Sequence, residues 1–505
     1  MYKKRDKNQL SFGEEFFLPF GGKLDKTNRW IVLSKIIPWD EIEEKYSKQF
    51  SHTGARAKDV RMALGSLIIK ERLGLSDEET VEQIKENPYL QYFIGKKSFE
   101  EAAAFDSSMM VHFRKRFAKE VMEEINEIII KKSKEDKDKP NDKGTGKQVE
   151  KTGEEIKEET KNQGTMAIDA TCTPADISYP TDIGLLNEAR EKTEKIIDTL
   201  WEKSENKGKK PRTYRKQARK EYLKISKNRK NSYETIRRGI SKQLNYVERN
   251  IRIINRLMDE LGELGIKGGR LKSFWVLQEL YRQQEIMYRE KKHSVEDRIV
   301  SISQPHVRPI VRGKKIANVE FGAKIEISVV EGYSHIEVIS WDSFNEGLNL
   351  KERIEKYKER YGCYPKVVLA DKIYRNRDNL KYCKERDIRL SGPKLGRKNE
   401  KTKREESKQI YEDSCARNVV EGKFGEGKRN YSLNRIMTKL KNTSETAIML
   451  SFIVMNLEHR LRLLFVKILR YIFGEVEVEY WVKKVLEHEN SDKKWVFQGS
   501  VKFFV

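Results

Sequence analysis

The sequence predicts an α/β protein: a mixed sheet with helices, a long helical insertion after the first strand, and an N-terminal all-helical domain. Residues 166–168 and 367–370 are short apolar runs that each end in an acid, as buried strands do at the exposed end of a sheet. Residues 1–131 and 185–300 instead carry apolar residues at helical spacing over long stretches. At 505 residues, the chain is long enough for roughly three domains of about 150 residues.

The N-terminal domain, residues 1–131, contains the outline of a helix-turn-helix. Residues 59–72 have helical spacing, Gly74 ends that helix, and Ser76 with Glu79 forms a capping box for the next one. The second helix is rich in acids, which would repel DNA phosphates. We therefore expect a packing hairpin rather than a recognition helix in a major groove.

The α/β domain is predicted in two pieces, residues 166–184 and 301–472. A charged segment at 132–165 has almost no apolar residue and is predicted to be a disordered linker, whereas 473–505 is a C-terminal tail. After the insertion we expect a hairpin turning at Gly332, a helix at 350–361 and the strand ending at Asp371. A helix at 377–386, a short strand at 388–390 and a basic loop at 394–408 should follow. The domain should end with a helix that contains Glu421 and a last helix from 447. This is the element order of a ribonuclease H-like domain, interrupted after its first strand.

The charge balance indicates nucleic acid as the partner. The net charge is +24, with 103 Lys and Arg against 79 Asp and Glu. In the helical basic insertion, residues 203–238 combine dense Lys and Arg with interleaved tyrosines, a pattern that suits phosphates and unstacked bases. The candidate DNA contacts there are Arg212, Arg215, Lys216 and Arg219. The alternative is a solvated helical hairpin with ordinary packing tyrosines.

Three carboxylates are the candidate catalytic residues and metal ligands. Asp169 and Asp371 follow the two apolar strands, and Glu421 lies in a helix. Phosphoryl transfer needs the attacking and leaving oxygens to be stabilised together, which two Mg²⁺ or Mn²⁺ ions can do, and such hard cations require carboxylate ligands. Asp169 could bridge both ions, while Asp371 and Glu421 each hold one.

The Glu421 helix carries cations on the same face. At about 100° per residue, Arg417, Glu421 and Lys428 fall within roughly 40° of one another. Such cations would hold the phosphates beside the scissile one. We also expect DNA contacts from three neighbours of the acids, Lys423, Arg429 and Tyr374.

These segments together resemble the DDE transposases of bacterial insertion sequences, of the groups conventionally numbered four and five. Their motif is Tyr, two residues, Arg, three residues, Glu, six residues, Lys, and this chain has Ser414, Arg417, Glu421 and Lys428 at that spacing. Residues 169–182 resemble the family's first-aspartate segment and residues 370–379 its second, with the usual Asp-x-x-Tyr. Residues 88–95 are similar to the helical domain that precedes the catalytic core.

The resemblance implies a function. It implies two-metal cleavage of double-stranded DNA at the terminal inverted repeats of an insertion sequence, and joining of the 3′-OH ends to target DNA. Because two ends must be handled together, a homodimer on DNA is expected. It also implies a bacterial, nucleoid-associated protein, and the cysteines, with no C-x-x-C pair, fit a reducing cytoplasm. The most apolar stretch, 447–457, is too short to span a bilayer, and the charged start is followed by no apolar export segment.

Other acids and other functions compete with this interpretation. Asp176, Asp182, Asp378 and Glu426 are nearby acids, but strand-end position and the shared face with Arg417 favour the three chosen. One alternative function is a non-catalytic DNA-binding transposase derivative. Another is a nucleotide hydrolase, because residues 422–428 match the phosphate-binding pattern G-x-x-x-x-G-K, although Arg429 stands where Ser or Thr should ligate Mg²⁺.

Overall fold

The computed structural model describes residues 1, 2, 4, 16, 18, 22–51, 53, 56–138, 161–204, 208–228, 230–262, 265–311, 319–393 and 403–473. Most of the predicted linker, the start of the predicted basic loop and the predicted tail from 474 lie outside these residues. Within the described part of the chain, no helix is both long and apolar enough to cross a lipid bilayer.

The N-terminal part is a group of helices, as predicted. They are α1 (Arg29–Ile36), α2 (Trp39–Ser47), α3 (Val60–Leu73), α4 (Asp77–Glu86), α5 (Pro88–Phe93), α6 (Met109–Arg116) and α7 (Lys119–Asp138). Gly74 ends α3 in the left-handed conformation, and the Ser76 side chain accepts the Glu79 amide at the start of α4. Asp77 of α4 pairs with Arg114 of α6 at 2.6 Å, so this acidic helix packs within the domain. The end of α7 lies inside the predicted linker.

The sheet joins strands from both sides of the insertion. It contains β1 (Thr165–Pro174), β2 (Arg308–Val311), β3 (Val319–Val330), β4 (Tyr333–Ser340), β5 (Val367–Leu369) and β6 (Arg389–Leu390). The strand β3 is antiparallel to β1 on one edge and to β2 and β4 on the other, whereas β5 is parallel to β1 and β6 is parallel to β5. The sheet is therefore mixed, as predicted, although no strand was expected at β2.

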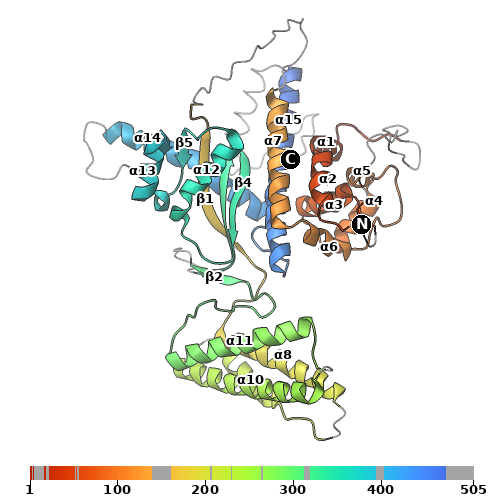
Figure 1. Ribbon diagram of the computed structural model, residues 1–505, viewed down its shortest axis with the longest axis vertical. Helices are drawn as coiled ribbons and strands as arrows, with labels where there is room; N and C mark the ends of the chain where they lie inside the picture. The colour runs from red at the N-terminus through yellow and green to blue at the C-terminus, as the bar shows by residue number, and fades with distance from the viewer. Residues whose placement is uncertain are drawn as a thin grey trace, which may run out of the picture.

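Helices cover both faces of this sheet (Figure 1). The short η2 (Glu346–Leu348) precedes α12 (Leu350–Tyr361), and η3 (Lys372–Tyr374) precedes α13 (Arg377–Glu385). Side chains of α12 and α13 form one core with Met166, Ile168 and Val368. On the opposite face, Ala167 and Leu369 share a core with α14 (Lys403–Asn430) and α15 (Lys441–Phe473). Because successive strand residues point to opposite faces, the odd-numbered residues of β1 face α14.

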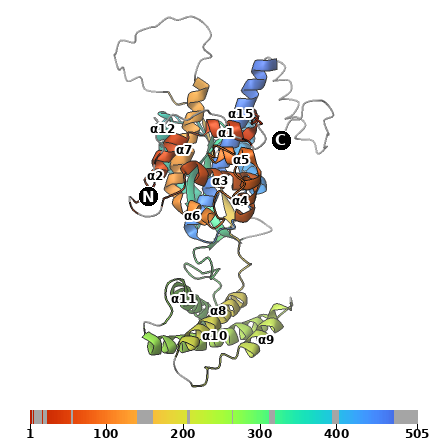
Figure 2. The same cartoon turned by 90° about the vertical axis from the view of Figure 1, so that its right-hand side faces the viewer.

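One hydrophobic core runs from the N-terminal helices through α15 to the sheet. Buried polar groups cross the same boundary. Asn456 of α15 donates to Asn126 of α7 at 2.8 Å and to the carbonyl of Ser334 in β4 at 2.9 Å. In Figure 2 the N-terminal helices stand in front of this body, with α7 and α15 beside them. The N-terminal helices are therefore packed onto the α/β part rather than tethered to it.

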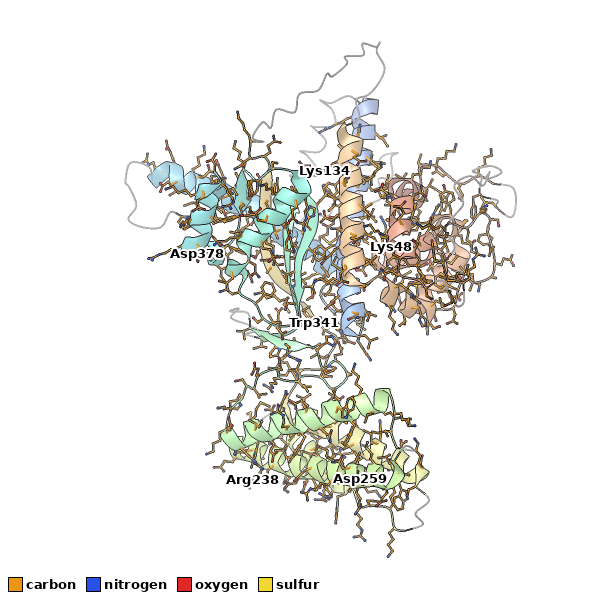
Figure 3. The ribbon with its side chains drawn as sticks, viewed as in Figure 1. Lys48, Lys134, Arg238, Asp259, Trp341 and Asp378 are labelled. Atoms are coloured by element: carbon orange, nitrogen blue, oxygen red, sulfur yellow. The ribbon has the colours of Figure 1, made fainter. Side chains whose placement is uncertain are left out.

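The insertion has a hydrophobic core of its own, formed by α8 (Asp182–Lys203), α10 (Tyr233–Leu261) and α11 (Gly269–Glu290). The smaller α9 (Arg215–Ser226) packs against α8 and α10 with mostly exposed side chains. Both views place the insertion at one end of the molecule, away from the N-terminal helices (Figures 1 and 2). In Figure 3, Arg238 and Asp259 lie near the two ends of α10, and Trp341 lies between the insertion and the sheet.

Candidate active site

Two of the predicted acids come from neighbouring strands, but the expectation that both lie at strand ends is wrong for the first. Asp169 lies in the middle of β1, which continues to Pro174, whereas Asp371 follows the end of β5 at Leu369. The parallel register of β1 and β5 ends with the pair Ala167 and Leu369, and each acid comes two residues later in the chain. Paired strands are about 4.8 Å apart. Asp169 lies on the odd-numbered face of β1, which is the side of the sheet that α14 covers, and the charge of Asp371 acts on it.

Asp169 is largely shielded from solvent, with 18% of its side chain exposed. Burial raises the pKa of this carboxyl; the Ala170 amide, which donates to it at 2.8 Å, and the Arg417 charge counter the rise. The charges of Glu346 and Asp371 raise the pKa further. Asp371 is exposed and caps η3, its side chain accepting the Lys372 amide at 2.7 Å. The site therefore concentrates negative charge in a partly desolvated place.

Arg417 joins the first and third predicted acids. Its Nη1 donates to Asp169 Oδ2 at 3.0 Å, and its Nη2 donates to Glu421 Oε1 at 2.9 Å. About three turns after Arg417 on the same helix, Lys428 donates to the buried Thr171 hydroxyl of β1 at 3.0 Å. Both cations of the predicted helical face thus lie against β1, and one guanidinium neutralises two carboxylates.

The donor chemistry of this site fits a hard divalent cation. Its acids offer carboxylate oxygens, the ligands that Mg²⁺ and Mn²⁺ prefer. In the conformation seen here, however, the Arg417 guanidinium lies between Asp169 and Glu421. Among the described residues, no group of three acids, histidines or cysteines is arranged to hold a metal ion. A metal ion would have to take the place of the Arg417 contacts.

The phosphate-binding-loop alternative is wrong. Residues 422–428 lie inside the continuous helix α14, whereas such a loop must link a strand to the start of a helix. One of the glycines, Gly427, has a packing role instead. A Cβ on Gly427 would lie 2.5 Å from Leu433 Cδ1, so α14 closely approaches the segment that follows it. A Cβ on Gly422 would meet nothing within 4 Å.

Two of the residues predicted to contact DNA are buried. Tyr374 has no exposed surface, and its hydroxyl donates to Glu326 at 2.8 Å. Lys423 is 8% exposed and pairs with Glu426, and burial lowers its pKa. The helical geometry turns Lys423 toward α15, and η3 turns Tyr374 into the core. DNA contact by either would require the core to open, whereas Arg429 is exposed.

The competing acids have structural partners. Asp176 pairs with Arg435 and Asp182 with Arg298. Glu426 pairs with both Lys423 and Arg462. Asp378 is exposed in the first turn of α13. The ion pairs of Asp176, Asp182 and Glu426 account for these acids without a catalytic role.

The predicted cations of the insertion are exposed. Arg212, Lys216 and Arg219 lie at the surface before and within α9. Arg215 differs, because it binds Asp198 of α8 through both terminal nitrogens, at 2.8 and 3.1 Å. The hydrogen bond from Arg215 lowers the pKa of Asp198. Three of the four cations therefore present charge to solvent, and the fourth helps to attach α9 to α8.

Sequence reasoning missed two acids beside the site. Glu346 of η2 pairs with Lys324 of β3 at 2.7 Å, and its charge acts on Asp169. Glu326 of β3 has a fully buried side chain and lies opposite Ala170 of β1. The signal for Glu326 was its place within the alternating strand pattern, where a charge on a buried face requires partners.

Two segments of the chain match models of known protein families. Residues 19–116 match a family model described as a transposase domain, and residues 368–458 match a model described as a transposase DDE domain. A Rhizobium meliloti protein named "Uncharacterized protein ORF8 in nfe locus" is 29% identical over 159 residues, which is 32% of this chain and 68% of that protein. No solved structure matches the chain.

Both matched models are transposase domains, so these two segments of the chain are similar to transposases. More narrowly, it carries a transposase DDE domain, and the predicted resemblance to the DDE transposases of insertion sequences is confirmed. The matched DDE segment includes Asp371, Arg417, Glu421 and Lys428, while Asp169 lies outside it.

Proposed function

We propose that this protein cuts DNA at the terminal inverted repeats of an insertion sequence and joins the released 3′-OH ends to target DNA. The observation that carries the proposal is the Arg417 bridge, which brings Asp169 and Glu421 together beside Asp371. The positions of these acids, within β1, directly after β5 and on the facing helix α14, suit one shared site. We place the chain with insertion sequences of groups four and five on the spacing of Arg417, Glu421 and Lys428.

The sheet supports a ribonuclease H-like core. Its central β1 has an antiparallel hairpin, β3 and β4, on one side and two parallel strands, β5 and β6, on the other. The insertion between β1 and β3 leaves this pairing intact. In this sheet the end of β5 lies beside the middle of β1, which brings the segment with Asp371 near Asp169.

Each side chain has a proposed role. Asp169, Asp371 and Glu421 would hold two Mg²⁺ or Mn²⁺ ions, which supply an activated water and stabilise the leaving oxygen. Arg417 exchanges its carboxylate partners for a phosphate beside the scissile one, and Lys428 holds a second phosphate. Water adds to phosphorus, and the 3′-oxygen leaves as a hydroxyl. That hydroxyl later attacks a phosphorus in target DNA, and the target's own 3′-oxygen leaves as a hydroxyl while the new phosphodiester forms.

The exposed cations of the insertion extend this surface. Arg212, Lys216 and Arg219 would contact the DNA backbone away from the site of cleavage. Because a transposon has two ends, we propose that a homodimer assembles on them. Gel filtration and footprinting should find two protein chains protecting paired ends, and a monomer on a single end throughout the reaction contradicts this assembly.

The test of function is Mg²⁺-dependent nicking of a duplex that carries the inverted repeats flanking the reading frame. Asp371→Asn should reduce nicking by more than about a hundredfold, beyond the loss expected for a residue that only supports a ligand. Asp378→Asn is the matched control, because it removes an exposed acid seven residues further on. The wild type should also leave a free 3′-OH, detectable by end labelling.

The same experiment separates the second candidate function, a non-catalytic DNA-binding derivative. If wild type and Asp371→Asn bind the inverted repeat equally and neither nicks it with Mg²⁺ or Mn²⁺, the catalytic proposal is wrong. Retained binding by both proteins then favours the derivative. Loss of nicking in Asp371→Asn alone, with binding unchanged, supports the enzyme.

A further inference from the structure

A buried acid lies directly beneath the candidate site. Glu326 of β3 lies opposite Ala170, the residue after Asp169, with its side chain on the sheet face that α12 covers. Arg353 of α12 donates to its Oε2 at 2.8 Å, and Tyr374 donates to its Oε1 at 2.8 Å. Both carboxylate oxygens are thereby satisfied, as a buried charge requires.

Tyr374 connects this buried acid to Asp371. The two residues are the ends of one tight turn, in which the Tyr374 amide donates to the Asp371 carbonyl at 3.1 Å. Burial raises the pKa of Tyr374, so its phenol keeps its proton and stays a donor. Burial also raises the pKa of Glu326, and the hydrogen bonds from Arg353 and Tyr374 counter that rise.

The same turn is held from its other side. Asn379 donates through Nδ2 to the Tyr374 carbonyl at 2.9 Å and to the Gly347 carbonyl at 2.7 Å. Gly347 lies so close to η3 that a Cβ there would clash with the Ile373 carbonyl oxygen. On the strand side, the Ser391 hydroxyl accepts the Ala370 amide at 2.9 Å. The backbone is therefore held by hydrogen bonds on both sides of Asp371, at Ala370 and at Tyr374, although the Asp371 side chain is exposed.

We propose that Tyr374 is a positioning residue, which holds Asp371 level with Asp169 through its hydrogen bond to Glu326. The inference rests on the proposed function of the acids and gives the tyrosine a role different from the DNA contact expected from the sequence. Glu326 belongs to β3, which pairs directly with β1, so the bond ties the loop after β5 to the strand that carries Asp169. Arg353 keeps the Glu326 carboxylate in place for this bond.

The test is Tyr374→Phe, which removes one hydroxyl and keeps the ring. Tyr357→Phe is the matched control: Tyr357 is 3% exposed in the same core, and its hydroxyl donates to the Gln163 carbonyl at 2.9 Å, not to Glu326. Mn²⁺ binding to the full chain without DNA, followed by electron paramagnetic resonance, should weaken about tenfold in Tyr374→Phe and stay at the wild-type level in the control.

A second readout separates positioning from loss of DNA binding. In Tyr374→Phe, the kcat for nicking should fall while the KM for the DNA end stays unchanged, because the exposed cations of α9 and α14 are untouched. Gly347→Ala provides an independent variant, since it disturbs η3 at Ile373 without removing the Tyr374 hydroxyl. It should also weaken Mn²⁺ binding.

Each outcome decides between the alternatives. Equal Mn²⁺ affinity in Tyr374→Phe and wild type overturns the inference, and so does equal weakening in Tyr374→Phe and Tyr357→Phe, which would indicate general loosening of the core. A wild-type protein that neither binds Mn²⁺ nor nicks DNA overturns the proposed function, and the inference with it. Selective weakening in Tyr374→Phe and Gly347→Ala supports both.

Discussion

Glu71 makes the stability of the contact between the N-terminal helices and α15 depend on pH. It lies in α3 with 7% of its surface exposed, and the Ser451 hydroxyl of α15 donates to its Oε1 at 2.7 Å. Burial raises the pKa of Glu71 from 4.5 to about 7, while the hydrogen bond from Ser451 and the Lys70 charge counter the rise. Near neutral pH, the folded protein therefore carries this carboxyl partly protonated.

The size and sign of the effect follow from linkage. Each pKa unit corresponds to about 1.4 kcal/mol, so a rise from 4.5 to about 7 amounts to roughly 3 kcal/mol. Because the folded pKa is the higher one, the contribution to stability is complete below the unfolded pKa and is lost as pH rises through the folded value. The variant Glu71→Gln stays neutral and can still accept the Ser451 hydroxyl. It should match wild type at about pH 3.5, below the unfolded pKa, and exceed its stability by roughly 3 kcal/mol at about pH 8.5.

Urea unfolding of both proteins at the two pH values measures this difference. Glu78→Gln, which changes an exposed acid in the next helix, is the control and should shift stability little at either pH. A stability difference between Glu71→Gln and wild type that is the same at both pH values would refute the reasoning. So would a variant that is less stable than wild type at the higher pH.

Three further predictions follow from the site and its supports. Gly427→Ala should destabilise the protein by about 1–3 kcal/mol, because the new Cβ clashes with Leu433. Gly422→Ala should instead stabilise it by about 0.5–1 kcal/mol, because the new Cβ meets no neighbour and alanine favours a helix. Thermal unfolding of the two variants tests this. Arg417→Gln should bind Mn²⁺ more tightly than wild type without DNA, because two carboxylates lose their cation, yet nick DNA more slowly; unchanged Mn²⁺ affinity would contradict the bridge. Replacing the exposed α9 cations by Ala should make DNA affinity less dependent on salt. The slope of log affinity against log salt concentration should fall by roughly one for each phosphate that these side chains neutralise, while the melting temperature stays unchanged. An unchanged slope would indicate that DNA binds elsewhere. The α9 cations changed are Lys216, Arg219 and Lys220.

Much of the sheet could be predicted because its strands leave a clear pattern. The run before Asp371 is apolar throughout, as a strand covered on both faces must be, and Gly332 marks the turn of the hairpin between β3 and β4. Asp169 stood out for a related reason: an acid directly after an apolar run needs an exposed or functional environment. The pattern did not reveal β2, whose four residues are too few for a periodicity.

The directions of individual side chains could not be predicted in the same way. Tyr374 follows Asp371 by three residues, and only the tight turn of η3 sends its ring into the core while the acid stays exposed. Lys423 is two residues from Glu421, but a helix turns about 200° over that distance, so the lysine faces α15. A cation close in sequence to a catalytic acid is therefore weak evidence of DNA contact unless its face of the helix is known.

The Arg417 bridge links the two binding events that the proposed reaction needs. The Arg417 guanidinium donates to both Asp169 and Glu421, so it uses oxygens that the proposal assigns to metal ions. A phosphate that draws Arg417 away returns oxygens of both acids to the site, so DNA binding should favour metal binding. Thermodynamic linkage requires the reverse as well: a bound cation displaces Arg417 and makes it accessible to phosphate by the same factor. Under the proposed function, the same arginine would compete with metal ions for these acids and release them more readily once a DNA end is in place.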